Sequence, residues 1–312
     1  MELSDLHVFR TVVQAGGVVR AAESLHRAQS SVTARIRALE EKLGVSLFVR
    51  EGRRLRLSPA GRVLLGYADR MLDLAKEAAH AVQTDGPSGT LRLGAMESTA
   101  AVRLPEPLGL FHERHPDVAL ELYSADPREL INDVLQAKLD AALIADPVSD
   151  RRLESQVIYD EELVIVAEAK HPAIQSAKDV PSRTLLAFHP GCPHRKRLED
   201  WFARGHVSPE RIVEVGSYHL ILGCVAVGMG VALVPRSVMD TYHERDRLSI
   251  HPLSPKFRRA KTRLIWRKEA PQAKILALSA VLLECNRGPT ATSASASLPS
   301  YTENATISRP PL

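Results

Sequence analysis

The 312-residue sequence is long enough for two folded domains, because a domain typically takes roughly 100–200 residues. With 45% hydrophobic and 25% charged residues it has the composition of a globular protein, which excludes collagen-like, wholly disordered and disulfide-scaffold classes. The net charge of +4 is small, so a basic surface requires local clustering, and an aromatic content of 4% argues against nucleic-acid binding through base stacking.

The cysteines and the apolar segments indicate a protein of the cytoplasm. Cys192, Cys224 and Cys285 have neither the spacing of a disulfide framework nor that of metal ligands. The N-terminus carries no apolar signal segment, and the longest apolar stretch, residues 221–235, is short and interrupted by glycines. We therefore expect a cytoplasmic chain with no membrane-embedded part.

The first 58 residues are predicted to form three helices and a hairpin. Apolar residues recur at helical spacing over residues 3–14, 18–25 and 29–43, and the first and third patterns stop at glycine. A glycine-containing turn then joins two short alternating segments, residues 48–50 and 55–57. These two segments predict a small hairpin or wing.

A long helix is predicted next, over residues 59–84, because Ser58 and Pro59 are typical of a helix start. Along it a heptad seam is formed by Leu64, Ala68, Met71, Ala75, Ala78 and Val82. The seam could pack on the helix's own domain or form a dimer contact. We prefer the dimer contact, because we expect the first 57 residues to offer too small a surface to bury it. Residues 59–88 are thus expected to be a linker with a hinge at its end.

Residues 89–286 alternate strands with helices. A βαβαβ pattern followed by a second α/β run predicts a mostly parallel sheet with helices on its faces. A late strand near residues 258–268 and a closing helix near residues 271–285 complete this domain. Residues 287–312 are rich in Ser, Thr, Ala and Pro, which predicts a disordered tail.

The N-terminal segment carries the charge pattern of a DNA-binding unit. Residues 1–62 hold eleven Lys and Arg against six Asp and Glu. The third helix offers small hydrogen-bonding side chains and basic side chains to the major groove, namely Gln29, Ser30, Ser31, Thr33, Arg35 and Arg37. The hairpin offers phosphate contacts through Arg50, Arg53, Arg54 and Arg56. For any one such helix alone, a merely solvated polar face is the more common explanation.

These elements together resemble the winged helix-turn-helix of the LysR-type transcriptional regulators. The resemblance is carried by Phe9, Ala15-Gly16-Gly17, Ala21-Ala22, Leu25-His26, Gln29-Ser30-Ser31-Val32-Thr33, Ile36, Leu39-Glu40, Leu43-Gly44, Leu47-Phe48, Arg50 and Leu57-Ser58-Pro59-Ala60-Gly61. It spans about residues 1–286. One departure concerns base reading: members often have Arg directly after the Ser/Thr of the third helix, where this chain has Ala34.

The resemblance implies an N-terminal winged helix-turn-helix (residues 1–58), a long linker helix, and a C-terminal α/β effector-binding domain (residues 89–286) of two subdomains similar to periplasmic binding proteins. Subdomain I is expected at residues 89–161 and 267–286, and subdomain II at residues 162–266. The implied partners are double-stranded promoter DNA, a second copy through the linker helix, a tetramer of such copies, and RNA polymerase. The implied ligand is a small-molecule co-inducer, with no cofactor.

Three predicted strand ends in the C-terminal domain carry polar residues, at residues 96–99, 189–193 and 216–219. Ligands of open α/β sheets bind at such strand ends. These three ends predict an effector pocket lined by Ser98, Thr99, Cys192, Arg195, Ser217 and Tyr218. Ser98 and Thr99 could instead be helix N-caps, or they could fill both roles. His189 and His194 near Cys192 do not make a strong zinc pattern, so we expect no metal.

The chemistry of the effector stays open between two classes. The subgroup that contains a putrescine-utilisation regulator is similar in four pieces: residues 97–103, Cys192 with Arg195, Glu199 with Trp201-Phe202, and residues 217–219. A diamine requires carboxylates, for which Glu97, Asp146 and Glu214 are candidates, although Gly216 replaces an acidic residue expected there. An anionic metabolite held at helix N-termini is equally compatible.

The sequence therefore predicts a sequence-specific transcriptional regulator controlled by a small effector. Two alternatives belong to other classes: an enzyme on the α/β domain, and an architectural DNA-binding protein without an effector. The enzyme is disfavoured because the sequence has no hydrolase elbow, no phosphate loop and no recognisable pair of catalytic carboxylates, so we name no catalytic residue.

Overall fold

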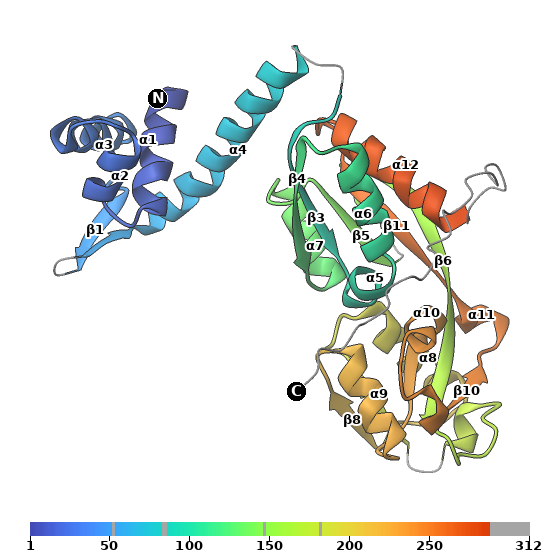
Figure 1. Cartoon of the computed structure of the whole chain (residues 1–312). Helices are drawn as coiled ribbons and strands as arrows, with labels where there is room; N and C mark the ends of the chain where they lie inside the picture. Colours follow the sequence, from blue (N-terminus) through green and yellow to red (C-terminus); the bar gives the residue numbers. More distant parts are fainter. Residues whose placement is uncertain (52–53, 83–85, 146–147, 181–182, 288–312) are drawn as a thin grey trace, which may run out of the picture.

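The computed structural model describes residues 1–51, 54–82, 86–145, 148–180 and 183–287. An N-terminal headpiece is joined by one long helix, α4, to a body of two lobes (Figure 1). The tail predicted to be disordered lies outside the described residues, apart from Arg287 at the end of the last helix. No helix in the described part of the chain combines the length and the apolar character needed to cross a lipid bilayer.

The headpiece has the elements that the sequence predicts. It contains α1 (Leu3–Gln14), α2 (Val18–Ser24), α3 (Gln29–Leu43), β1 (Phe48–Glu51) and β2 (Arg54–Leu57). Leu6, Phe9 and Val12 of α1 pack against Ile36 and Leu39 of α3 in one core. Antiparallel pairing of β1 with β2 confirms the wing.

Helix α4 (Pro59–Ala81) begins where predicted, because the Ser58 hydroxyl accepts a hydrogen bond from the Gly61 N–H at 2.9 Å. Its first half packs on the headpiece: Ala68 and Leu72 are buried in the same core as α1. The expectation that the headpiece offers too little surface is therefore wrong, since a face of α1 covers this part of the helix. The exposed large apolar side chains of α4 belong instead to Val63, Tyr67 and Leu74, whereas Val82 of the predicted seam, just after the helix, is exposed as well.

The first lobe is built on a parallel arrangement of three strands. These are β3 (Gly89–Ala95), β4 (Val118–Ser124) and β5 (Ala141–Ala145), with β3 between the other two. The helices of this lobe are α5 (Glu97–Val102), α6 (Pro105–Arg114), α7 (Pro127–Leu135) and the closing α12 (Ala273–Arg287). Leu91 and Leu93 of β3 and Leu278 of α12 lie in its core.

The second lobe has its own core around residues of β9 and the helices that flank it. Its strands are β7 (Thr184–Ala187), β8 (Arg211–Glu214), β9 (Ala232–Pro235) and β10 (Leu248–Pro252). Its helices are α8 (Pro193–Arg204), α9 (Tyr218–Ala226), α10 (Arg236–Asp240) and α11 (Pro255–Arg258), with single turns at Ala177–Asp179 and Arg245–Arg247.

Two long strands connect the lobes, β6 (Leu153–Glu168) and β11 (Arg259–Arg267) (Figure 1). They pair antiparallel with each other, and β6 also pairs antiparallel with β9 and β10. The predicted mostly parallel sheet is thus wrong: the sheet is mixed, because the chain crosses to the second lobe on β6 and returns on β11. Residues 262–266 pair with β5 of the first lobe, so the return falls earlier than the expected boundary at residue 267.

A partly buried ion pair lies where the lobes meet. Arg103, which follows α5, donates two hydrogen bonds to the Glu161 carboxylate of β6, at 2.8 and 2.9 Å. The hydroxyl of Ser237 in α10 donates a third at 3.1 Å. Glu161 is therefore held by one side chain from each lobe, and the arrangement fixes how α5 and α10 face each other.

Candidate functional site

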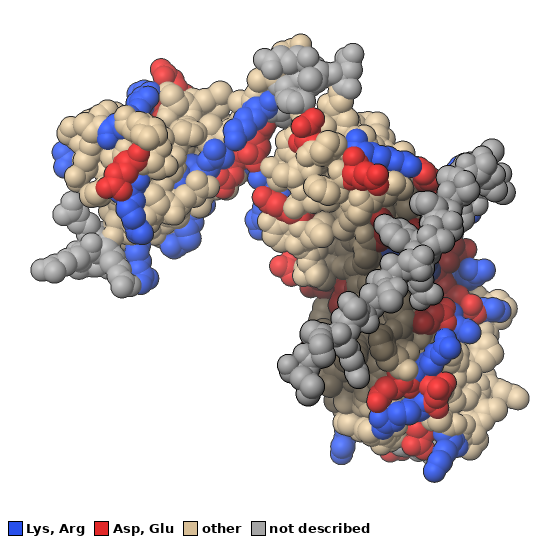
Figure 2. Space-filling view, viewed as in Figure 1, with Lys and Arg blue, Asp and Glu red and all other residues tan. Residues whose placement is uncertain are grey.

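The headpiece presents a hollow between α2, α3 and the wing. Gln29, Thr33 and Arg37 of α3 line it together with Arg56 of β2. Ser30 and Ser31, at the start of α3, are exposed. Basic side chains gather along the same edge of the headpiece, beside the wing (Figure 2). The start of α3 and one edge of the wing can thus meet DNA together.

Arg35 has a different role from the one predicted. Its guanidinium turns toward α1, where it donates to Asp5 at 3.0 Å and to the Ser4 hydroxyl at 2.7 Å. The Arg35 hydrogen bond keeps the pKa of the Asp5 carboxyl below its usual range. Arg35 therefore joins α3 to α1, because it lies on the side of α3 away from Thr33 and Arg37.

The wing arginines are described only in part. Arg56 is exposed and lines the hollow. Arg53 and the side chains of Arg50 and Arg54 lie outside the described residues. Their phosphate contacts stay predictions.

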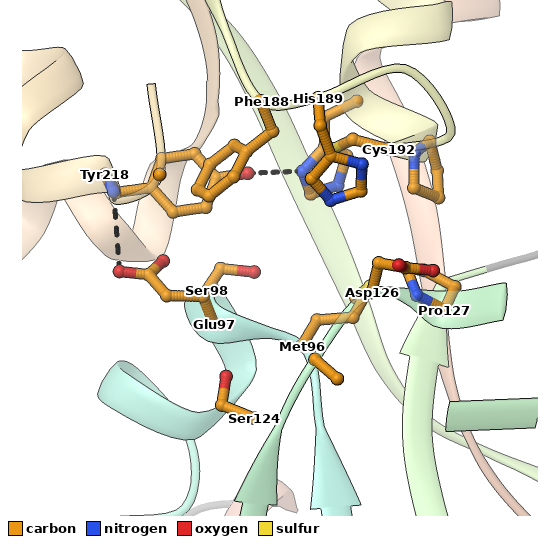
Figure 3. Close-up of a pocket in the computed structure, with 14 residues that line it drawn as sticks. Met96, Glu97, Ser98, Ser124, Asp126, Pro127, Phe188, His189, Cys192 and Tyr218 are labelled. Atoms are coloured by element: carbon orange, nitrogen blue, oxygen red, sulfur yellow. Dashed lines mark hydrogen bonds between the residues drawn. The ribbon is translucent and has the colours of Figure 1, made fainter. Parts of the chain in front are cut away.

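A cleft of about 220 Å³ lies between the two lobes (Figure 3). Its first-lobe side is formed by the start of α5 and by the segment that leads from β4 into α7. Its second-lobe side is formed by the start of α8 and the start of α9. The lining residues are Met96, Glu97, Ser98, Ser124, Ala125, Asp126, Pro127, Phe188, His189, Cys192, Pro193, His194, Gly216 and Tyr218. Most of this surface is apolar. Its volume lies below the roughly 300–1,000 Å³ of pockets that hold drug-sized molecules, so the cleft fits a smaller ligand.

Three of the six predicted effector residues, Ser98, Cys192 and Tyr218, line the cleft. The other three lie outside its lining. Thr99 is buried within α5, and Ser217 caps α9 by accepting from the Leu220 N–H. The N-cap of α5 is Met96, so Ser98 and Thr99 do not have the capping role considered for them.

Arg195, the sixth predicted residue, is occupied by protein groups. Its guanidinium donates to Glu199 at 2.9 Å, to the Phe188 carbonyl at 3.0 Å and to Glu214 at 3.3 Å. Glu214, a candidate for binding a diamine, is consequently paired and outside the lining, and Asp146 lies outside the described residues.

Tyr218 and His194 form a neutral polar pair in the second-lobe wall. The Tyr218 hydroxyl lies 2.6 Å from the His194 Nδ1, and both residues are buried. Burial lowers the pKa of His194 to about 4, so the ring is uncharged at neutral pH. Burial also raises the pKa of Tyr218 well above its usual value. The Tyr218 ring packs on Phe188, which places an aromatic surface beside the cleft (Figure 3).

Glu97 is the unusual polar group of the cleft. Its Oε1 accepts a hydrogen bond of 3.4 Å from the Tyr218 N–H across the two lobes (Figure 3). Its Oε2 is buried, and no hydrogen-bond partner for it occurs among the described residues. Burial raises the pKa of the Glu97 carboxyl, because desolvation disfavours its charged form. A buried carboxylate oxygen without a partner is costly, so this atom is available to a ligand.

Sequence reasoning missed several lining residues. Asp126 and Phe188 come from different lobes, and only the fold brings them together, whereas His194 enters the sequence analysis only as a possible metal ligand. Asp126 did carry a signal, since Asp before Pro is typical of a helix start, and its side chain caps α7 through the N–H groups of Arg128 and Glu129.

The cleft offers little for metal or redox chemistry. In the described segments, no group of three or more His, Cys, Asp or Glu side chains could hold a metal ion. Burial raises the pKa of the Cys192 thiol, which keeps it protonated and weakly nucleophilic.

Comparison with known families divides the chain in the same way as its fold. Residues 3–62 match the family described as "Bacterial regulatory helix-turn-helix protein, lysR family", and residues 84–285 match "LysR substrate binding domain". The HTH-type transcriptional regulator GltR of Bacillus subtilis (strain 168) is 36% identical over 270 residues, which cover 86% of this chain and 91% of that protein.

Solved structures share the fold. A full-length OxyR variant from Pseudomonas aeruginosa superposes with a TM-score of 0.67 at 24% identity, covering 91% of this chain and 98% of that one. Full-length CbnR complexed with its target DNA superposes with a TM-score of 0.66 at 24% identity, covering 92% and 100%. Both comparisons extend over headpiece, long helix and lobes.

Proposed function

The chain belongs to the LysR-type transcriptional regulators, and from this premise we propose that its cleft binds a small effector bearing a protonated amine. As a member of this family the protein is a DNA-binding transcriptional regulator whose activity a small molecule controls. The proposal concerns the place and the chemistry of that molecule. The observation that carries it is the buried, unpartnered Oε2 of Glu97.

The charges around the cleft favour a cation. Glu97 and Asp126 contribute carboxylates to the lining, whereas the described lining has no Lys or Arg. His194 is neutral at pH 7, and the nearby Arg195 is paired with Glu199 and Glu214. A buried carboxylate is strongly stabilised when an opposite charge arrives with hydrogen bonds, so an ammonium group matches Glu97.

The same geometry disfavours a carboxylate effector. The first N–H groups of α7, which could bind an anion, already donate to Asp126. An anion in the cleft would also face Glu97 at close range in a desolvated setting, where like charges repel strongly. Of the two effector classes that the sequence leaves open, the cationic one therefore has the better support.

Thermal unfolding with matched probes tests this proposal. We expect n-butylammonium, but neither butyrate nor n-butanol at equal ionic strength, to raise the Tm of the lobes. A ligand at tenfold its Kd adds about 1.4 kcal/mol, or about 3 °C or more. Glu97→Gln should abolish the shift, whereas Glu113→Gln, on the exposed face of α6, should preserve it. Protection by butyrate, or equal protection of the Glu97→Gln variant, would contradict the amine assignment.

On the DNA side, Gln29, Ser30, Ser31, Thr33 and Arg37 of α3 are the residues proposed to face the major groove. The wing arginines are proposed to contact the flanking phosphates. Support comes from the exposed start of α3 and from the hollow that Arg37 and Arg56 share. Members of this family bind promoter DNA and form oligomers, so two headpieces would read two half-sites.

The exposed stripe on α4 is proposed as the contact between two copies. Val63, Tyr67 and Leu74 are exposed at spacings of four and seven, which place them on one face of the helix. Leu74→Arg should shift the protein toward monomers in sedimentation velocity, whereas Lys76→Ala on the same helix should not. A Leu74→Arg variant that keeps the wild-type association state would place the contact elsewhere. A tetramer of two such pairs and contact with RNA polymerase are further expectations from the family.

The effector is proposed to leave the cleft chemically unchanged. Cys192 is a protonated thiol, and the His194 ring is already bonded to Tyr218, so neither side chain is set to activate a nucleophile. Mass spectrometry of a ligand recovered after long incubation with the protein should find it intact. Conversion proportional to protein concentration would revive the enzyme alternative.

A further inference from the structure

A charged cluster joins the three parts of the molecule. Asp73 of α4 accepts a hydrogen bond from the Arg92 guanidinium of β3, and its other oxygen lies 3.8 Å from Arg10 of α1. One carboxylate on the linker helix thus contacts both the headpiece and the first lobe. Arg10 also lies 3.9 Å from Asp69, one turn earlier on α4.

This cluster is more enclosed than an ordinary surface ion pair. The side chains of Asp73 and Arg92 are only 24% and 18% exposed. Arg92 is also fixed from its own lobe: its Nε donates to Glu121 at 3.1 Å, and its backbone N–H donates to Asp140 at 2.7 Å. Pairing with Asp73 keeps the pKa of Arg92 raised against the opposing effect of burial. A guanidinium positioned by its neighbours loses little entropy when it binds one further carboxylate.

A second contact supports the same docking of α4. Arg70, one turn before Asp73, donates to the backbone carbonyl of Gln136 just after α7. It comes from the same stretch of helix and meets a different segment of the first lobe. Two contacts at separate points restrict rotation of α4 against the lobe, which a single contact would not do.

We infer that Asp73 and Arg92 are positioning residues that set the direction in which the first lobe holds the headpiece. The inference goes beyond effector binding and beyond the DNA contacts, since neither residue is proposed to touch ligand or base. Two headpieces that are already held at a fixed angle can bind two half-sites together without losing further orientational freedom on binding. Headpieces released from the lobe would lose that advantage on a two-site operator, but not on a single half-site.

A double-mutant cycle with two DNA ligands tests this inference. The operator is first selected from random DNA by the wild-type protein, and a single half-site is cut from it. We expect Asp73→Asn and Arg92→Gln each to weaken binding to the operator by about fivefold or more, the lower range of allosteric couplings. The double variant should lose no more than either single one, because both substitutions break the same contact. Affinity for the single half-site should not change.

The matched control is the pair Arg114→Gln and Glu284→Gln, which removes an exposed bidentate ion pair between α6 and α12. It should leave both affinities unchanged. Equal losses on the operator and the half-site would mean that the variants damage the headpiece, and would overturn the inference. So would an unchanged or increased affinity for the operator, an additive double variant, or a changed association state in sedimentation.

Discussion

Breaking the Arg103–Glu161 ion pair is expected to destabilise the junction of the lobes. Glu161 is 6% exposed, and Arg103 donates two of the three hydrogen bonds that its carboxylate accepts from described residues. Arg103→Met removes the guanidinium, which donates to Glu161 and whose Cζ lies over the Tyr159 ring, 5.2 Å from its centre, but it keeps a flexible apolar side chain. The variant therefore reports the loss of the charged group, with little change in apolar packing.

The size of the effect follows from the exposure of each partner. Removing one partner of a fully buried ion pair costs about 3–5 kcal/mol. Here the Arg103 side chain is 34% exposed, so water can reach part of the site that it leaves, and Ser237 still donates to Glu161. We therefore expect a loss of about 2 kcal/mol for Arg103→Met, and about 1 kcal/mol for Ser237→Ala, which removes one neutral donor.

Urea unfolding followed by tryptophan fluorescence measures this loss, because Trp201 and Trp266, the two tryptophans of the chain, lie one in each lobe. The headpiece has none, so its unfolding does not enter the signal. The double variant Arg103→Met/Glu161→Gln should be more stable than the sum of its single variants predicts, since it leaves no unpaired charge. A loss below about 0.5 kcal/mol for Arg103→Met, or strict additivity, would refute the reasoning.

Three further predictions concern other parts of the molecule. Gly61→Ala should destabilise the headpiece by about 2 kcal/mol, because the added Cβ would lie 2.1 Å from the backbone oxygen of Leu47. Gly66→Ala, in open space on the same helix, should stabilise the headpiece by about 1 kcal/mol. Thermal unfolding followed by circular dichroism measures both changes. The lobes should lose about 3 kcal/mol as the pH falls from about 6.5 to about 4, because the pKa of His194 is lowered to about 4 in the folded state and the unfolded state binds the proton first. His194→Gln should flatten that slope in urea unfolding. Arg37→Ala should weaken operator binding by about 1–3 kcal/mol, whereas Arg35→Ala should lower headpiece stability and leave the salt dependence of binding intact.

Each of these has a result that would contradict it. Equal effects of Gly61→Ala and Gly66→Ala would mean that the close approach of α4 to the wing does not constrain the helix start. A His194→Gln variant with the wild-type pH slope would assign the acid sensitivity to other groups. A reduced salt slope for Arg35→Ala would return that residue to the DNA-facing side of α3.

The elements of the headpiece could be predicted from sequence because their signals are local. The predicted limits of α3 are those observed, since its apolar period and Gly44 lie within the helix and its C-cap. Ser58 likewise has its capping partner three residues away. Helical period, caps and glycine stops depend on residues close together in the chain, so they can be recognised without knowledge of the fold.

Predictions failed where a side chain's partner lies far away in the sequence. Arg35 is bonded to Asp5 of another helix, so the sequence around α3 could not show that its guanidinium turns away from the DNA-facing side. Arg195 is bonded to Glu214 of β8 and to Glu199 one turn along its own helix, and only the pairing with Glu199 could be recognised from the spacing. The predicted dimer seam of α4 failed in its first half for the same reason, because Ala68 is covered by α1, which is far away in the sequence. The mixed sheet depends on β6 and β11 crossing between lobes, which strand order by itself does not reveal.

The central claim is that a cation bound beside Glu97 controls DNA binding. Fluorescence anisotropy of the selected operator, titrated with wild-type protein and with Glu97→Gln in n-butylammonium or butyrate, tests it most directly. The account predicts that n-butylammonium shifts operator affinity for the wild-type protein only, by about fivefold or more, and that butyrate shifts neither. A shift caused by butyrate, or one that persists in Glu97→Gln, would contradict it.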